Sequence, residues 1–89
     1  MDFAQCIERV KKMEEIYDVL LKAAEEGGAA LAEKKDMLRE LKEYYEGSLW
    51  LSDYEADERG ELPADMKRGV LSQDGVYDLL CNIENIMQA

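Results

Sequence analysis

The chain has 89 residues, of which 47% are hydrophobic and 36% are charged, a composition typical of one small folded domain rather than a disordered segment. Its 21 acidic and 11 basic side chains give a net charge of −10, so electrostatic repulsion argues against nucleic acids and anionic membranes as partners. No apolar run approaches the roughly 18 residues that span a bilayer, and the N-terminus lacks the pattern of a secretory leader, so we expect a cytoplasmic protein.

The first predicted element is a long amphipathic helix. Apolar side chains recur at intervals of three and four residues, which predicts a helix from about residue 2 to residue 25, on the order of 35 Å long. Its apolar stripe consists of Phe3, Cys6, Val10, Met13, Tyr17, Leu20 and Ala24. Gly27 and Gly28 interrupt this spacing, and adjacent glycines favour a helix C-cap and a turn. The chain is therefore expected to double back here.

The second predicted helix covers residues 29–46. Leu31, Leu38, Leu41 and Tyr45 resume the helical spacing. Lys34 falls in the same stripe, where its aliphatic stem can pack while its ammonium group reaches water. Gly47 is expected to end the helix. Residues 1–46 thus predict a long antiparallel helical hairpin.

A third helix is predicted over residues 73–88. Ser72 can cap its N-terminus, and Asp74 in the first turn favours the helix dipole. Its apolar positions are Val76, Leu79, Leu80, Ile83, Ile86 and Met87. Because no segment alternates apolar and polar residues over a strand length, the predicted fold class is all-α. We expect a single domain, a three-helix bundle made of the hairpin and residues 73–89, with residues 47–72 as an acidic and aromatic connection.

Residues 48–66 of the connection carry half of the net charge, because they hold six acids and one base. Residues 52–55 have the spacing of a capping box, and Gly60 can close a short helix behind them. Pro63 can start a further helical turn, and Gly69 is expected to supply a left-handed residue before the third helix. One or two short helices are therefore predicted here, wrapped over the end of the hairpin.

The connection has two interpretations. In the first it is a structural lid: Lys67 and Arg68 fold back to neutralise the acidic helix, while Trp50 and Tyr54 pack inward. In the second, the aromatic rings stay partly exposed beside carboxylates and form a polar-rimmed surface for a protein or a basic peptide. That candidate interaction surface comprises Trp50, Tyr54, Glu55, Asp57, Lys67, Arg68 and Tyr77.

The acidic segment 53–61 is also a candidate cation site. It does not match an EF-hand loop, because Glu58 stands where the turn needs Gly and Ala64 stands where a bidentate Glu belongs. Carboxylates four residues apart on a helix repel one another, however, and a divalent cation would relieve that repulsion. A looser metal site built from Asp53, Asp57 and Glu58 is therefore the alternative.

Catalytic chemistry is poorly represented in the sequence. The chain has no His and no Thr, so a serine or cysteine nucleophile would lack an imidazole base. No glycine-rich phosphate loop follows a strand, and no cofactor is expected. An enzyme would need a concave pocket that contains a desolvated carboxylate. We therefore expect a protein without catalytic activity.

The two cysteines, Cys6 and Cys81, lie far apart and in no C-x-x-C pair. Both fall on apolar faces, which favours two reduced thiols that pack as small hydrophobic groups. A disulfide or a reactive thiol is the alternative.

The most distinctive stretch of the chain is residues 44–80, YYEGSLWLSDYEADERGELPADMKRGVLSQDGVYDLL. Its characteristic elements are Tyr44-Tyr45, Trp50, Asp53 to Gly60, Leu62-Pro63, Asp65, Lys67 to Ser72, and Val76 to Leu80. On these residues the chain resembles a family of small bacterial proteins, domain-of-unknown-function family 4298, while the N-terminal hairpin matches chiefly in helical pattern. Where family members commonly have L-S-E-D-A, this chain has Leu71-Ser72-Gln73-Asp74-Gly75, which weakens the start of the third helix. The resemblance implies a bacterial, cytoplasmic protein and assigns no activity.

The predicted function is a non-enzymatic protein-interaction or accessory module, whose protein partner the sequence does not identify. Binding of a divalent cation or another cationic ligand by segment 53–61 is the alternative. Because the second helix covers the long stripe of the first imperfectly, a second copy of the chain can complete the core. A two-fold homodimer is therefore the alternative to a monomer.

Overall fold

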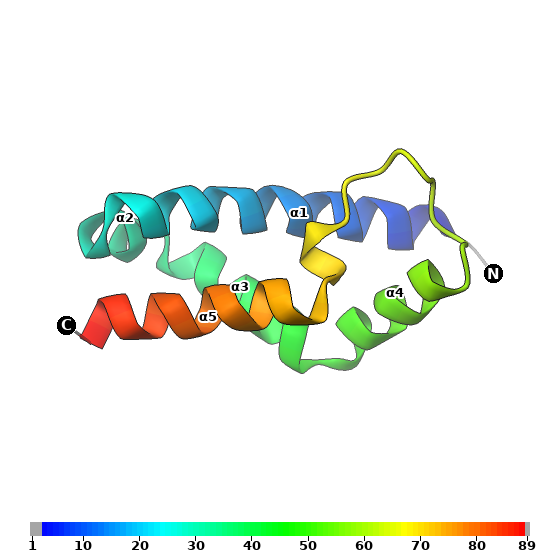
Figure 1. Ribbon diagram of the computed structural model, residues 1–89. Helices are drawn as coiled ribbons and strands as arrows, with labels where there is room; N and C mark the ends of the chain where they lie inside the picture. Colours follow the sequence, from blue (N-terminus) through cyan, green and yellow to red (C-terminus); the bar gives the residue numbers. More distant parts are fainter. Residues whose placement is uncertain (1–2, 89) are drawn as a thin grey trace.

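The computed structural model describes residues 3–88 and contains helices, turns and one loop but no strand within that range. In chain order the elements are α1 (Phe3–Glu26), α2 (Gly28–Glu33), α3 (Lys35–Glu46), α4 (Ser48–Glu58), the 3₁₀ turn η1 (Gly69–Leu71) and α5 (Gln73–Gln88) (Figure 1). The predicted all-α fold class is confirmed. Over residues 3–88, none of the helices is both long enough and apolar enough to span a membrane.

Helix α1 is the central helix and contacts α2, α3, η1 and α5. α3 returns antiparallel to α1, and α5 runs beside them so that the end of α5 lies near α2 (Figure 1). α1 contacts both α3 and α5, whereas α3 and α5 make few contacts with one another. The fold is elongated, with principal extents of 44 × 19 × 17 Å. The hairpin and the C-terminal helix are both present, but α3 and α5 each pack against α1 and hardly against one another.

The core is formed by the inward stripe of α1 together with buried side chains from every other helix, including the stripe of α5. The buried members of the predicted α1 stripe are Cys6, Val10, Met13 and Leu20, with Tyr17 and Ala24 partly buried. On α5 the buried members are Val76, Leu79 and Ile83, with Leu80 and Ile86 partly buried. Both stripes are confirmed, although the side chain of Phe3 lies outside the described residues and Met87 is exposed. Each fully buried Val or Leu contributes roughly 1.5–3 kcal/mol relative to an exposed one, so the buried members of the two stripes stabilise the fold.

The second predicted helix is divided into α2 and α3 at Lys34, so the prediction of one continuous helix is wrong. The Lys34 N–H bonds to the carbonyl oxygen of Leu31 at 2.9 Å, only three residues back. In a straight helix the side chains of Leu31 and Leu41 would point about 80° apart, because ten residues advance about 1000°, less than three turns. Both side chains are fully buried, so the break turns both toward the core. It also buries Tyr44 in place of the predicted Tyr45, which is partly exposed.

Helix α4 starts at Ser48, four residues before the predicted capping box. Ser52 and Asp53 therefore lie inside the helix, and the predicted start is wrong. The physical reason is a buried face: Trp50, Asp53 and Ala56 are buried at intervals of three residues, which holds a longer segment in helical form.

Glycines mark the turns of the chain, with one difference from prediction. Gly27 and Gly60 have positive φ angles of 113° and 74°, at the turn after α1 and behind α4. Gly47 ends α3 as predicted. Gly69 does not have a positive φ, so its predicted left-handed conformation is wrong. A Cβ atom at position 69 would lie 3.3 Å from Oε2 of Glu14, so this glycine allows η1 to approach α1 closely.

Residues 61–68 form a loop that contains one turn rather than a helix. The Met66 N–H bonds to the carbonyl oxygen of Pro63 at 3.2 Å, which is the whole of the helical turn predicted after Pro63. η1 is the second short element of the connection. α5 then begins where predicted, because Ser72 Oγ accepts a hydrogen bond from the Gly75 N–H at 3.2 Å and caps the helix.

Candidate functional site

A buried carboxylate on α4 joins three helices. Asp53 is fully buried, and both of its oxygens accept hydrogen bonds. Arg9 of α1 donates from Nε to Oδ2 at 2.8 Å and from Nη2 to Oδ1 at 2.5 Å. The hydroxyl of Tyr44 on α3 donates to Oδ2 at 2.7 Å, and the thiol of Cys6 donates to Oδ1 at 3.1 Å. These four residues, the Asp53 cluster, fasten α4 to α1 and α3.

The hydrogen bonds of the Asp53 cluster favour the charged carboxylate. Burial alone would raise the pKa of Asp53, but the bonds from Arg9, Tyr44 and Cys6 outweigh burial and hold this pKa below its ordinary value. Burial, together with the bond to Asp53, raises the pKa of the Cys6 thiol to about 11. The same two causes raise the pKa of the Tyr44 hydroxyl. None of these groups changes charge near neutral pH, so the cluster is suited to a structural role.

The structure separates Asp53 from the other two predicted metal ligands, Asp57 and Glu58, which line one hollow. Asp53 points into the core, Asp57 is paired with Arg68, and Glu58 is exposed. Within residues 3–88 no group of three or more candidate ligands is placed to hold a metal ion. Asp53 cannot join a surface site, because both of its oxygens are occupied by donors inside the bundle.

Trp50 packs inward, as the lid interpretation predicts. Its side chain is only 7% exposed, and its Nε1 donates to the carbonyl oxygen of Val70 in η1 at 2.9 Å. The ring of Tyr45 lies edge-on to the indole with centroids 5.0 Å apart, and the ring of Tyr54 stacks on it at 5.2 Å. Trp50 is therefore not available to a partner, and the prediction that it forms part of an exposed surface is corrected.

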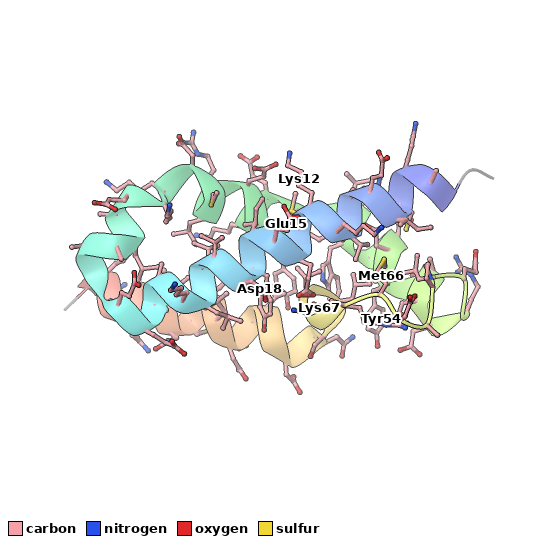
Figure 2. The ribbon with its side chains drawn as sticks, turned by 90° about the horizontal axis from the view of Figure 1, so that it is seen from above. Lys12, Glu15, Asp18, Tyr54, Met66 and Lys67 are labelled. Atoms are coloured by element: carbon pink, nitrogen blue, oxygen red, sulfur yellow. The ribbon has the colours of Figure 1, made fainter. Side chains whose placement is uncertain are left out.

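The two bases at the end of the connection behave differently. Arg68 folds back on α4 as predicted: it forms an ion pair with Asp57 and donates to the carbonyl oxygens of Pro63 and Ala64 at 3.1 and 3.0 Å. Lys67 instead lines a hollow with Glu14 and Asp18 of α1, and Figure 2 shows it on the loop beside that helix, near Asp18. Neutralisation of α4 thus comes from Arg68 and not from Lys67.

A second buried carboxylate, Glu14, lies in the wall of a hollow of about 550 Å³ between α1 and the loop. Lys11, Glu15, Asp18 and Lys67 give this hollow a mixed charge. An acid–base site would need a carboxylate in such a place, but one Glu14 oxygen accepts a hydrogen bond from the Val70 N–H at 3.0 Å. Glu14 therefore fastens η1 to α1, as Asp53 fastens α4.

An apolar groove lies between α3 and α5, and we call it the α3/α5 groove. It encloses about 430 Å³. Its lining residues are Leu38, Lys42, Tyr45 and Glu46 of α3 with Tyr77, Leu80, Cys81, Ile83, Glu84, Met87 and Gln88 of α5. Tyr77 is 58% exposed and Met87 is 41% exposed, so two large side chains face solvent along this groove.

Sequence reasoning missed this groove except at Tyr77. The signal was a second apolar stripe on α5, because Tyr77, Leu80 and Met87 repeat at helical spacing beside the stripe that enters the core. Leu80 and Met87 were instead predicted as core positions. α5 is thus apolar on two faces, and α1 covers one of them.

The structure brings the predicted interaction surface together only in part: Tyr54, Asp57 and Arg68 line one hollow of about 350 Å³ beside α4, and the other four residues lie outside it. Trp50 is buried, and Tyr54 is half-buried against it. Asp57 pairs with Arg68, and Glu55 is exposed within 4.0 Å of Arg59. Tyr77 lies in the α3/α5 groove, and Lys67 lines the hollow beside α1. These residues do not form one continuous patch.

The two cysteines are both free thiols. Cys6 is buried in the Asp53 cluster, as the packing prediction requires. Cys81 is partly exposed in the wall of the α3/α5 groove, where its bond with Tyr77 raises the pKa of the tyrosine hydroxyl. No disulfide joins the pair, so the disulfide alternative is not supported.

Comparison with known proteins assigns a family. No curated protein and no solved structure gives a significant match. The family model described as Domain of unknown function (DUF4298) matches residues 10–89, which contain α2 to α5 and most of α1. The matched region includes Asp53, Trp50 and both walls of the α3/α5 groove. Because the match covers most of the chain, this protein belongs to the DUF4298 family.

Proposed function

We propose that this protein is a non-enzymatic interaction module whose α3/α5 groove docks an amphipathic helix of a partner protein. The supporting observation is the exposure of Tyr77 and Met87 along an apolar hollow on a strongly acidic molecule. Concave apolar sites with a few polar groups at the rim are typical of binding sites. Tyrosine and methionine are also enriched at the centres of protein interfaces.

A helix fits the shape of this groove. Its walls are two helices that make few contacts with one another, and α1 contributes no lining residue. A further helix laid between α3 and α5 would complete a four-helix arrangement and bury the exposed stripe of α5. Ten residues separate Tyr77 from Met87, about 15 Å of helix, which matches roughly three turns of a partner helix.

Charge disfavours a second copy of the chain in the groove. Each copy carries a net charge of −10, so two copies repel one another over long range. The homodimer stays a prediction, and charge favours a partner of different sequence over a second copy. From the family resemblance we also propose that the module acts in a bacterial cytoplasm, where the Cys81 thiol of the groove would stay reduced.

The proposal is tested with a fluorescein-labelled peptide of about 18 residues, roughly 27 Å as a helix, with leucines on one face and glutamines elsewhere. Fluorescence anisotropy measures its binding to the wild-type protein and to two groove variants, Tyr77→Ala and Met87→Ala. We expect each variant to weaken binding by about fivefold or more, because exposed anchors at the centre of an interface carry most of its energy.

The matched control is Leu51→Ala. Leu51 is 51% exposed and lies on α4, outside the groove, so its removal should leave binding unchanged. Failure of the neutral peptide to bind, or equal binding by wild type and both groove variants, would overturn the proposal. Light scattering adds a second decision: a stable dimer that Tyr77→Ala dissociates would show that a second copy occupies the groove, and would also overturn it.

Cation binding by segment 53–61 stays a prediction, and no contact of the described residues favours it. Asp53 and Asp57 are both paired with arginines. A cation that binds the folded state raises the melting temperature, so thermal unfolding with calcium, magnesium and manganese is the test. A rise that disappears in Glu58→Gln would support the site, and unchanged melting would exclude it.

A further inference from the structure

We infer that the partner helix is basic and that Glu46 and Glu84, on opposite walls of the α3/α5 groove, select it. This inference rests on the proposed function. Glu46 belongs to α3 and Glu84 to α5, and both line the groove and are exposed. A helix between the two walls therefore passes a carboxylate on each side. The chemistry that fits is an apolar face flanked on both edges by Lys or Arg.

The two rim carboxylates carry unpaired charge. Among residues 3–88 no basic side chain forms an ion pair with either of them. Glu84 accepts a hydrogen bond from the neutral amide of Gln88 at 3.3 Å, which leaves its charge uncompensated.

The arginines of the chain are occupied elsewhere. Each of the four pairs with a carboxylate outside the groove: Arg9 with Asp53, Arg39 with Asp36, Arg59 with Glu61 and Arg68 with Asp57. These ion pairs stabilise the free protein and leave the rim charge of the groove to be met by a partner.

Lys42 modifies this preference at one point. It lines the α3 wall four residues before Glu46, so it stands one helical turn away, and it has no ion pair among the described residues. A partner helix whose α3 edge carries an acid opposite Lys42 and a base opposite Glu46 matches both charges. Reversing the direction of the helix places like charges together, so Lys42 and Glu46 also favour one orientation.

The size of the effect follows from exposure and net charge. Solvent-exposed ion pairs contribute little individually, but the net charge of −10 adds a long-range attraction that salt screens. At low ionic strength we expect a basic peptide to bind about tenfold more tightly than a neutral one with the same apolar face. This advantage should shrink toward equality at about 1 M salt, where the Debye length is only about 3 Å.

The test compares three peptides that share one apolar face and differ in their flanks: lysine and arginine, glutamine, or glutamate. Anisotropy titrations measure their affinities for the wild type and for the double variant Glu46→Lys with Glu84→Lys. We expect the double variant to bind the basic peptide about tenfold more weakly than the wild type does, and to bind the acidic peptide more tightly. The variant Lys42→Glu should bind the basic peptide more tightly than the wild type does.

The matched control is Glu8→Lys with Glu15→Lys. Both residues are exposed on α1 outside the groove, and this variant changes the net charge by the same amount. Equal binding of basic and neutral peptides to the wild type, or an equal loss in control and rim variants, overturns the inference. The proposed function survives either result as long as the neutral peptide binds and depends on Tyr77; it fails if the neutral peptide does not bind.

Discussion

The Asp53 cluster and the α3/α5 groove combine similar residues in opposite ways. Each contains a cysteine, tyrosine and carboxylate contributed by several helices. In the cluster, Arg9, Tyr44 and Cys6 all donate to one carboxylate that is fully buried. In the groove, the carboxylates are unpaired and Tyr77 is exposed. Complete pairing is consistent with a scaffold role for the cluster, and incomplete pairing supports the proposal that the groove binds a partner.

Scaffold of this kind also accounts for the charge of the connection. Asp53, Asp57 and Glu61 of the connection each pair with an arginine, and two of those arginines lie in the connection itself. Buried polar groups are costly unless each has a partner, so an acidic segment whose buried and half-buried carboxylates are all paired is consistent with a fixed structural element. The groove differs, because Tyr77 and Met87 are exposed and its carboxylates have no ion pair among the described residues.

Among single substitutions in the Asp53 cluster and its surroundings, replacing Asp53 by alanine should destabilise the protein most. The change leaves Arg9, Tyr44 and Cys6 without their shared acceptor, and breaking a buried ion pair typically costs about 3–5 kcal/mol. Because the Arg9 side chain is 25% exposed and can turn to water, we expect about 3 kcal/mol. Urea unfolding followed by circular dichroism measures the change in the free energy of unfolding.

The control for Asp53 is Asp57→Ala, which removes the ion pair to Arg68 near the surface. We expect a loss of about 1 kcal/mol or less, since partly exposed pairs contribute little. An Asp53→Ala variant as stable as Asp57→Ala would contradict the structural role of the cluster.

Trp50→Phe should destabilise the protein by about 1–3 kcal/mol. Phenylalanine lacks the indole N–H, so the carbonyl oxygen of Val70 loses its partner and part of the ring volume is emptied. Leu49→Ala, at a side chain 50% exposed on the same helix, should change stability by less than about 0.5 kcal/mol. Thermal melting distinguishes the two, and equal melting temperatures would show that Trp50 is not an anchor.

Glu14→Ala should cost about 1–2 kcal/mol, because the buried N–H of Val70 loses its acceptor. Glu14→Gln keeps an acceptor oxygen and should cost less than Glu14→Ala. Chemical denaturation of both variants is the measurement. If glutamine is as harmful as alanine, the charge of Glu14 has a role beyond its bond to η1.

The Asp53 cluster should make stability depend on pH at both extremes. An unfolded Asp titrates near pH 4, and the pKa of folded Asp53 is lower, so its contribution is present above about pH 4 and is lost as pH falls through the lowered value. The pKa of Cys6 is raised from 9.0 to about 11, so its contribution is present below pH 9 and is lost as pH rises toward 11. Unfolding free energies measured across pH should lose the acid slope in Asp53→Asn and part of the alkaline slope in Cys6→Ser; unchanged slopes would contradict this assignment.

Gly75→Ala should have the smallest effect. A Cβ atom there would lie 2.8 Å from the hydroxyl oxygen of Tyr17, so the tyrosine must shift. The better helix propensity of alanine, about 0.5–1 kcal/mol, offsets part of that cost. We expect a net change within about 1 kcal/mol, and a more favourable one when Tyr17 is also replaced by phenylalanine. A double-mutant cycle by thermal melting measures this coupling, and zero coupling would contradict the close approach.

The elements that could be predicted from sequence are those set by periodicity. The stripe of α1, the turn at Gly27 and the start of α5 at Ser72 all depend on local spacing and capping. The break at Lys34 could not be predicted, because it depends on where Leu31 and Leu41 meet α1. Tertiary position overrides local preference in such cases.

The site was harder to predict than the fold for the same reason. Asp53 looked like a surface ligand because its neighbours in sequence are acidic, yet its partner is Arg9, which lies 44 residues away. Met87 looked like a core residue because it continues an apolar pattern, yet it is partly exposed in the groove. Residue type is local, whereas the availability of partners depends on long-range packing.

Backbone chemical-shift mapping can locate the binding surface residue by residue. A ¹⁵N-labelled wild-type protein is titrated with the basic amphipathic peptide, and amide shifts are followed along the chain. If the peptide binds in the α3/α5 groove, the largest changes should occur in residues 38–46 and 77–88, with small changes through α4 and the loop behind it. The largest changes in residues 53–68 would contradict the proposed function, because the connection would then be the binding surface and the α3/α5 groove would not.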